Sequence, residues 1–391
     1  MKQQEPLWTP AFLLAWAANF LHSTGFHAYV HLPGWLEARG AGEVLIGVLI
    51  ATMSVAAIST RPLVGRVMDT RGRKLVVLVG GVVHSVVPLL YLLVDALATD
   101  SWAAVAGVRL VHGVAQAAMF SVLFTVAADL VPANRRAEGI ALFGISGLIP
   151  MGIGGLLGDL VIVDGDYRNL FWITSACAVL GLLCSLALPE TRRGGSSRGF
   201  LAALRAPELR PLWFVGTSFA MGLAAYFVFL KTYLLEAPQL GTMSMFYGVY
   251  ALSAVLLRVL FSWVPERYGM MRVLIPSMVI SAGGLLLLAV ASGPVHLIIS
   301  AALCGIGHGF AFPITSALVV TRAHPEERGS AIALYTALYD LGMLLGGPSF
   351  GIAVKLAGYA WTFALAGVLV FIATAVFVTW DRRLGPQVTR G

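Results

Sequence analysis

The chain consists of long apolar runs separated by short polar interruptions. Most runs contain roughly 20 residues, which is the length of helix that crosses the hydrocarbon core of a bilayer. They lie at about 8–32, 43–67, 75–94, 101–128, 139–161, 169–188, 211–234, 243–264, 273–291, 295–320, 330–354 and 358–380. This pattern predicts an all-α integral membrane protein with twelve transmembrane helices.

The longest polar interruption divides the runs into two sets of six. It covers residues 189–210 and begins with the sequence Pro-Glu-Thr-Arg-Arg. We expect an N-terminal six-helix bundle over residues 1–188, a cytoplasmic linker over 189–210 and a C-terminal six-helix bundle over 211–391. The first run is too long for a signal-peptide core and contains polar residues, so we interpret it as a spanning helix.

The composition excludes an ordinary soluble protein. Hydrophobic residues make up 58% of the chain and charged residues 12%, whereas about a quarter of the residues in soluble proteins are charged. The mean hydropathy is +0.85. The net charge of +7 comes from basic residues in short loops between apolar runs, which indicates a lipid surface as the partner and not nucleic acid. Cys177, Cys184 and Cys304 lie inside apolar runs, and we interpret them as packing residues.

The distribution of Lys and Arg predicts the orientation in the membrane. If the N-terminus is cytoplasmic, 19 of the 26 basic residues fall in inside loops and tails, and only Arg39, Arg168 and Lys355 fall outside. Short cytoplasmic loops carry such an excess of positive charge. We therefore expect a protein of the cytoplasmic (inner) membrane with both termini in the cytoplasm.

The two halves of the chain resemble each other at a fixed spacing. With an offset of 197 residues (258 − 61), Arg61, Gly65, Asp69 and Gly72 recur as Arg258, Ser262, Glu266 and Gly269. The pair His112-Gly113 recurs as His308-Gly309 at nearly the same offset. Repeated halves of this kind are typical of transporters built from parallel repeats.

A dense charge cluster lies between the second and third runs. Its residues Gly65, Asp69, Gly72, Arg73 and Lys74 resemble, position by position, the signature loop between helices 2 and 3 of the major facilitator superfamily of secondary transporters. The resemblance implies two pseudo-symmetric six-helix bundles, alternating access and no enzymatic activity. It also implies a cytoplasmic gate in which Asp69 accepts hydrogen bonds from a facing helix N-terminus and pairs with Arg73. The expected gate residues are Gly65, Asp69, Gly72, Arg73, Lys74, Arg258 and Glu266.

Polar residues follow one face of several predicted helices. Arg109, His112 and Gln116 share one face of the fourth run, and a lipid-facing Arg, His and Gln would be very costly. Arg109-Leu-Val-His112-Gly113 also resembles the Arg-x-x-Gln-Gly motif of helix 4 in the superfamily, with His in place of Gln. The stripe lines either a wet cavity, which we favour, or a dry helix contact. The resemblance implies that helices 1, 4, 7 and 10 line a central cavity, whose expected residues are Asn19, His22, Ser23, Phe26, Arg109, His112, Gln116, Lys231 and His308.

The expected cavity contains cations and histidines but no carboxylate. This predicts an anionic or polar, hydrogen-bonding small-molecule substrate, and it argues against lipophilic cations. The histidines are candidates for carrying protons. His27 and His31 have the spacing of a metal pair but no third ligand nearby, so we expect neither a metal nor a cofactor.

Asp340 is the only acidic residue placed inside a spanning run. It lies roughly 16 Å from the cytoplasmic end of its helix, and Arg61 lies about 12 Å deep in the second run. The resemblance places their helices face to face across the two halves. We predict an inter-bundle ion pair that protonation of Asp340 breaks, with Arg109 as a further proton-coupling residue; the alternatives are a permanent structural pair or two residues that never meet.

The fifth run is rich in glycine and contains Pro150, and it partly resembles the Gly-Pro-x-x-Gly-Gly motif of efflux members. We therefore expect a monomeric transporter most similar to the proton-coupled drug and sugar-efflux branch. The alternatives are uptake or facilitated diffusion of an organic anion or sugar, lipid translocation, or, more remotely, a membrane-embedded enzyme or receptor.

Overall fold

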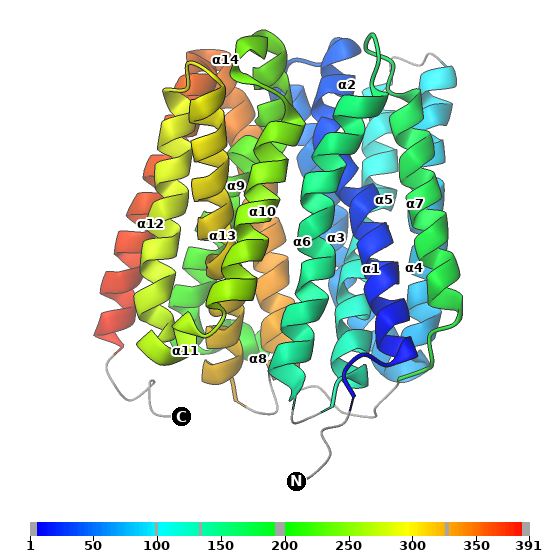
Figure 1. Ribbon diagram of the computed structural model, residues 1–391, viewed down its shortest axis with the longest axis vertical. Helices are drawn as coiled ribbons and strands as arrows, with labels where there is room; N and C mark the ends of the chain where they lie inside the picture. The colour runs from blue at the N-terminus through cyan, green and yellow to red at the C-terminus, as the bar shows by residue number, and fades with distance from the viewer. Residues whose placement is uncertain (1–5, 98–100, 133–134, 192–199, 325–327, 385–391) are drawn as a thin grey trace.

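The computed structural model describes residues 6–97, 101–132, 135–191, 200–324 and 328–384 as a bundle of long helices (Figure 1). The helices of the first half are α1 (Pro10–His27), α2 (Leu32–Ala38), α3 (Glu43–Arg71), α4 (Arg73–Ala96), α5 (Trp102–Leu130), α6 (Arg136–Val161) and α7 (Arg168–Leu186). Those that follow are α8 (Phe200–Arg205), α9 (Arg210–Glu236), α10 (Met243–Phe261), α11 (Val264–Tyr268), α12 (Met270–Ala289), α13 (Pro294–Arg322) and α14 (Arg328–Arg383). Short 3-10 turns that lie wholly within the described residues are η1 (Ala28–His31), η3 (Pro207–Leu209) and η4 (Pro238–Leu240).

The helix ends follow from local chemistry. Thr9 caps α1, because its hydroxyl accepts a hydrogen bond from the backbone N–H of Phe12 at 3.2 Å, and Pro10 occupies the first helical position. The first predicted run ends in the turn η1, and α2 continues beyond it. Within α14, Gly358 has φ 81° and ψ 175°, so this one element contains two helices, as the two runs 330–354 and 358–380 predict.

Among the described residues, ten helices are long and apolar enough to cross a membrane. One of them is α14, which Gly358 divides, and α1 supplies a further run. The protein is therefore an all-α integral membrane protein, and its helices are consistent with twelve spans.

The helices form two bundles that lie side by side. In Figure 1 the helices of the first half occupy the right-hand side and those from α9 onward the left-hand side. Across the interface α3 packs against α14, and α6 packs against α10. The contact is close because a Cβ atom on Gly47 of α3 would stand only 2.2 Å from the carbonyl oxygen of Gly347 of α14.

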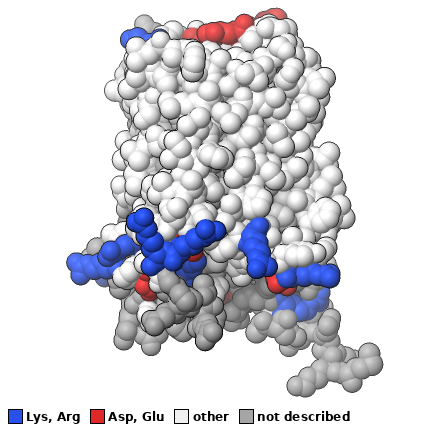
Figure 2. Space-filling model, turned by 90° about the vertical axis from the view of Figure 1, so that its left-hand side faces the viewer, with Lys and Arg blue, Asp and Glu red and all other residues white. Residues whose placement is uncertain are grey.

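Charge is confined to the two ends of the face shown in Figure 2. Lys and Arg form a band near the lower end, acidic residues gather at the upper end, and the belt between them is uncharged. Helix α1 begins and α14 ends at the same lower end as the basic band (Figure 1). Large apolar side chains such as Leu156, Leu183 and Phe371 are exposed, as expected of surfaces that contact lipid.

The turn after α3 has a backbone conformation similar to that of its counterpart in the second half. Gly72, between α3 and α4, has φ 105°, and Gly269, between α11 and α12, has φ 96°. Side chains with a Cβ rarely adopt such angles. The glycines that recur at the offset of 197 residues (269 − 72) therefore meet the same conformational requirement.

Candidate functional site

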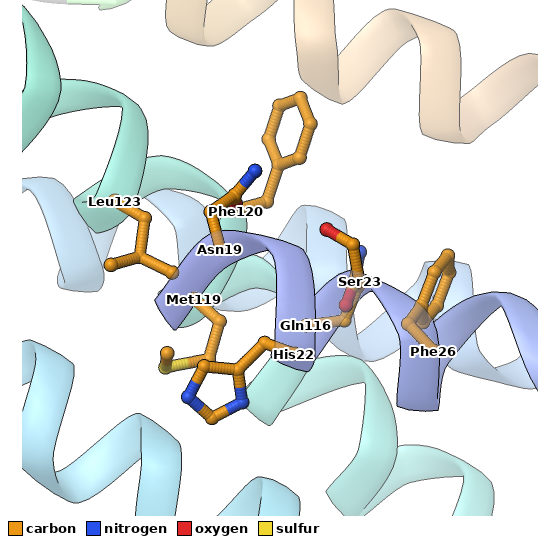
Figure 3. A pocket seen from close by; sticks show the side chains of 8 residues that line it. All are labelled: Asn19, His22, Ser23, Phe26, Gln116, Met119, Phe120 and Leu123. Atoms are coloured by element: carbon orange, nitrogen blue, oxygen red, sulfur yellow. The ribbon is translucent and has the colours of Figure 1, made fainter. Parts of the chain in front are cut away.

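A small cavity lies between α1 and α5 (Figure 3). Its volume of about 20 Å³ is room for roughly one water molecule. Five of the expected cavity residues line it, namely Asn19, His22, Ser23, Phe26 and Gln116, together with Met119, Phe120 and Leu123, which the sequence analysis did not single out.

Half of the residues that line the cavity are polar, but none of them is acidic or permanently cationic. Asn19 is held in place because its amide nitrogen donates to the hydroxyl of Ser146 on α6 at 2.7 Å. A Cβ atom on Gly147 of the same helix would lie 3.8 Å from that amide nitrogen, so α6 passes close beside this wall. Ser23 and Gln116 contribute a hydroxyl and an amide from α1 and α5. The wall therefore offers neutral hydrogen-bonding groups beside the rings of Phe26 and Phe120.

Three histidines gather at one side of the cavity, and His22 is the member that lines it. The Nδ1 atoms of His22 and His84 are 3.2 Å apart, and the two rings are stacked with centroids 5.2 Å apart. The ring of His112 follows at 5.8 Å from that of His84. Since a hydrogen bond between two Nδ1 atoms needs one donor and one acceptor, His22 and His84 must adopt complementary tautomers. His84 comes from α4, and sequence spacing gave no signal that it would join this group.

Arg109 and His112 do not line the cavity. The Arg109 guanidinium donates to the carbonyl oxygens of Leu49 at 3.2 Å and Ile50 at 2.7 Å, and it lies 3.4 Å from Nδ1 of His112. Both side chains are buried, with exposures of 3% and 0%. The arrangement corresponds to the helix contact that the sequence left open, and not to the cavity that it favoured, because carbonyl oxygens of α3 accept the hydrogen bonds of the arginine.

Lys231 and His308 also lie away from the cavity. Lys231 is near the outer end of α9, where its stem packs against Gly34 of α2 and its charge interacts with Glu37 and Asp159. His308 contacts the hydroxyls of two tyrosines of its own bundle, with Nδ1 against Tyr250 and Nε2 at 3.1 Å from Tyr339. Tyrosines count as apolar in a hydropathy pattern, so the sequence did not reveal these partners.

The predicted pair of Arg61 and Asp340 is present. Asp340 Oδ2 accepts hydrogen bonds from Nη2 of Arg61 at 2.6 Å and from Nε at 2.9 Å. The exposures of the two side chains are 8% and 23%. The Arg61 guanidinium also donates to the hydroxyl of Ser121 at 3.3 Å and lies 5.8 Å from the ring of Phe120. The ion pair between the bundles thus touches a residue of the cavity wall.

In the signature loop, the charged side chains mainly form ion pairs and hydrogen bonds within the first bundle. The Asp69 carboxylate is 3.9 Å from Nη2 of Arg73, and Nε of Arg73 is 3.3 Å from the Asp129 carboxylate. The Glu190 carboxylate accepts the backbone N–H groups of Arg73 at 2.9 Å and Lys74 at 3.1 Å, and therefore caps α4. Thr191 donates to Asp129 at 3.0 Å, so the start of the linker is fixed to this bundle.

The other expected gate residues lie apart from one another. Gly65 faces open space, and Glu266 is exposed on α11. Arg258 is inside the protein and not in the loop, because its Nε donates to the carbonyl oxygen of Gly309 at 3.0 Å. The chain just before α14, residues 325–327, lies outside the described residues, so the expected contact of Asp69 with a facing helix N-terminus stays a prediction.

Comparison with known proteins gives a family. The family model described as Major Facilitator Superfamily matches residues 11–274 and 212–390. An uncharacterized MFS-type transporter of Burkholderia pseudomallei (strain 1106a) is 27% identical over 352 residues, covering 88% of this chain and 85% of the relative. The MFS-type transporter YhhS of Salmonella enteritidis PT4, also named as uncharacterized, is 27% identical over 363 residues, covering 91% and 88%.

Solved structures share the fold at low sequence identity. A mutant of the nucleoside transporter NupG superposes with a TM-score of 0.80 at 16% identity, covering 95% of this chain and 99% of that one. The human organic anion transporter MFSD10 superposes with a TM-score of 0.74 at 18% identity, covering 96% of this chain and 100% of that one. A POT family transporter in complex with a thioalcohol-conjugated peptide superposes with a TM-score of 0.81 at 12% identity, covering 95% of this chain and 96% of that one.

Proposed function

The chain belongs to the Major Facilitator Superfamily and is a membrane transporter, and from this premise we propose that it moves a small organic solute by proton-coupled alternating access. The two bundles would rock about a site between them. The basic band and the shared end of α1 and α14 support an inner-membrane orientation with both termini in the cytoplasm.

The ion pair of Arg61 and Asp340 is the observation that carries the proposal. It joins α3 of one bundle to α14 of the other, and the Arg61 side chain is largely shielded from solvent. When one partner of a buried pair is neutralised, the other remains as an uncompensated charge, at a cost of about 3–5 kcal/mol. A proton on Asp340 would therefore favour a conformation in which Arg61 finds other partners.

Arg61 connects this event to the cavity. Its guanidinium already contacts Ser121 and the ring of Phe120, and Phe120 lines the cavity. A shift of Arg61 on protonation of Asp340 would change the position of Phe120 and with it the shape of the wall. Proton binding and substrate binding would then favour different conformations of the same helices, which is the requirement for coupling.

The cavity wall favours a polar substrate over an anionic one. Asn19, Ser23 and Gln116 offer uncharged donors and acceptors, whereas Arg109 and Lys231 interact with carbonyl oxygens and carboxylates elsewhere. Phe26 and Phe120 would pack against the apolar face of such a solute in a conformation in which the cavity is wider than its present volume of about 20 Å³. The solved structures of similar fold are named for nucleosides, organic anions and peptides, so the fold by itself does not choose among these classes.

The proposed direction is efflux. It rests on the glycine-rich α6, in which Gly152 and Gly155 lie against α10 of the other bundle. This is the helix whose sequence partly resembles the efflux motif. Net solute flux in vesicles of known orientation, measured with the pH gradient in each direction, would distinguish efflux from uptake, because antiport and symport move the solute in opposite directions.

The test is transport by vesicles reconstituted with the purified chain, using a panel of anions, sugars and polar amphipaths with and without a pH gradient. We expect a pH gradient to drive accumulation of a polar solute, and Asp340→Asn to reduce this accumulation to simple equilibration. The matched control is Asp381→Asn, which disrupts a buried pair with Arg322 (2.5 Å) inside one bundle. It should lower stability but keep the response to the gradient.

Two results would contradict the proposal. One is gradient-driven transport by Asp340→Asn at the wild-type level and with the wild-type pH profile. The other is a transported solute whose accumulation by the wild-type protein is independent of the pH gradient.

A further inference from the structure

The outer ends of the two bundles are joined by a carboxylate at a helix N-terminus. Asp159, at the outer end of α6, accepts a hydrogen bond at 2.6 Å from the backbone N–H of Ser244 in the first turn of α10. The hydroxyl of Thr242 caps the same helix by accepting the N–H of Met245. Free N–H groups and the helix dipole both favour a negative charge at this position.

At the same end, a second carboxylate joins the two bundles along their other contact, which we call the α3–α14 seam; the first contact is the α6–α10 seam. The Tyr359 hydroxyl of α14 donates a short hydrogen bond to Glu43, the first residue of α3. The backbones are tightly packed here, since a Cβ atom on Gly351 would lie 2.6 Å from the carbonyl oxygen of Glu43. Both seams therefore carry one carboxylate of the first bundle that accepts a hydrogen bond from the second.

The surrounding charges complete this cluster. Lys231 of the second bundle interacts with both Asp159 and Glu37. Burial, together with the negative charges of Glu43 and Glu236, raises the pKa of Glu37 above its ordinary value. The outer mouth thus holds more acids than cations, and two of these acids, Asp159 and Glu43, accept a hydrogen bond across the interface.

We propose that Asp159 and Glu43 are positioning residues of the transport cycle, which hold the outer side closed while the substrate site is open to the cytoplasm. This inference rests on the proposed alternating access, because opening the outer side requires both hydrogen bonds to break. The superfamily signature led us to expect a carboxylate at a helix N-terminus on the cytoplasmic side. Asp159 makes this kind of contact at the opposite end, between α6 and α10.

The expected effect is a shift in the populations of the two conformations. Asp159→Asn keeps the shape of the side chain but replaces a charge-assisted hydrogen bond by a neutral one, which is roughly half as strong. The outward-open fraction should then rise about tenfold. Apparent affinity for substrate offered from the cytoplasmic side should fall, because fewer molecules present that site.

The experiment measures access to the seam and does not depend on knowing the substrate. Ala251 of α10 is buried against α6, where a Cβ atom on Gly152 would lie 3.2 Å from its own Cβ. In a chain whose three cysteines are replaced by alanine, Ala251→Cys serves as the reporter. A membrane-impermeant maleimide is added from the outside, and the labelling rate is compared with and without Asp159→Asn.

Matched variants separate the gate from a general loss of stability. Asp164→Asn changes the same residue type in the neighbouring outer loop and should label at the background rate, as should Asp159→Glu, which keeps the charge. Tyr359→Phe should raise labelling, whereas Tyr233→Phe, whose ring lies beside that of Tyr359, should not. Thermal unfolding of each variant in detergent shows whether it is folded.

The outcomes are distinct. Faster labelling in Asp159→Asn and Tyr359→Phe alone supports the gate, even if no solute responds to a pH gradient. Unchanged labelling in both folded variants overturns it, even if proton-coupled transport is observed. Equal acceleration in Asp164→Asn also overturns it, because the effect would then reflect loss of surface charge.

Discussion

At the scale of single residues, Gly72 is subject to two independent constraints. Its backbone, with φ 105° and ψ 161°, lies in a region that is essentially restricted to glycine. A Cβ atom there would also stand 2.2 Å from Oε2 of Glu190, the residue that caps α4. Gly65, in the same signature loop, has nothing within 4 Å of a Cβ atom and lies inside a helix.

These two glycines should respond in opposite directions to the same substitution. We expect Gly72→Ala to destabilise the protein by about 1–3 kcal/mol, because it strains the turn and displaces Glu190. Gly65→Ala should be neutral or stabilise α3 by about 0.5–1 kcal/mol, because alanine loses less backbone entropy in a helix. Thermal unfolding of the two purified variants in the same detergent makes the comparison. Equal melting temperatures would contradict this account of the loop.

The partner of a side chain could be predicted from the sequence where few partners were available to it, and not elsewhere. Asp340 was the only acid placed in a spanning run, and its pairing with Arg61 was predicted from the depths of the two residues, the cost of an isolated buried charge and the facing helices that the family resemblance implies. Arg109 has backbone carbonyls as its partners, and these have no sequence signal. The partners of His308 are tyrosines, which are indistinguishable from core residues in an apolar pattern.

At the scale of elements, the packing of α3 on α5 explains why Arg109 is not in the cavity. A Cβ atom on Gly113 would lie 2.1 Å from the carbonyl oxygen of Met53, so the two helices touch along their backbones. This approach brings the guanidinium one turn away to the carbonyls of Leu49 and Ile50. Small residues at such crossings allow close contact in membranes.

Separating these helices should therefore be costly. We expect Gly113→Ala to lower stability by about 1–3 kcal/mol through overpacking. The control is Gly107→Ala in the same helix, where a Cβ atom meets nothing within 4 Å and the change should be tolerated. Fluorescence-detected size-exclusion after a heating series gives the midpoint for both. A Gly113→Ala protein as stable as the control would show that α3 and α5 can readjust freely.

The elements themselves were largely predictable, because apolar length alone limits a helix in lipid. The predicted runs and the helices agree to within a few residues at most ends. The turn at Ala28–His31 was not predicted because the apolar pattern continues through it, and the short helix α2 lies beyond the end of the predicted run at residue 32. The boundary within α14 was predicted as a gap between two runs, but only the backbone of Gly358 shows that the helices meet there without a loop.

At the scale of the whole molecule, alternating access requires the α6–α10 seam to open in each cycle. A Cβ atom on Gly152 would lie 3.2 Å from Cβ of Ala251, close to the separation of Cβ atoms joined by a disulfide. We expect the double variant Gly152→Cys/Ala251→Cys, in a chain without other cysteines, to lose transport on oxidation and to regain it with reductant. Each single variant should transport under both conditions. Full transport by the oxidised double variant would mean that this seam stays closed throughout the cycle.

The repeat of the two halves was visible in the sequence, but the different partners of equivalent residues in the two halves were not. Equivalent arginines, Arg61 and Arg258, differ because, within the described residues, the first pairs with a carboxylate across the interface and the second donates to the carbonyl oxygen of Gly309 in its own bundle. Equivalent histidines differ likewise, since His112 lies among imidazoles and an arginine, and His308 lies among phenols. An internal repeat fixes where side chains project, whereas the partner across the interface comes from the other repeat and is not constrained by it.

The attachment of Glu190 to the start of α4 also bears on how far the two bundles would move apart in the proposed cycle. Because Glu190 and Thr191 are both pinned to the first bundle, the covalent tether between the bundles begins after residue 191 and not where α7 ends. If the bundles rock as proposed, a rearrangement that releases the Glu190 carboxylate would lengthen the connection between them, and this one side chain would limit the reach of the movement.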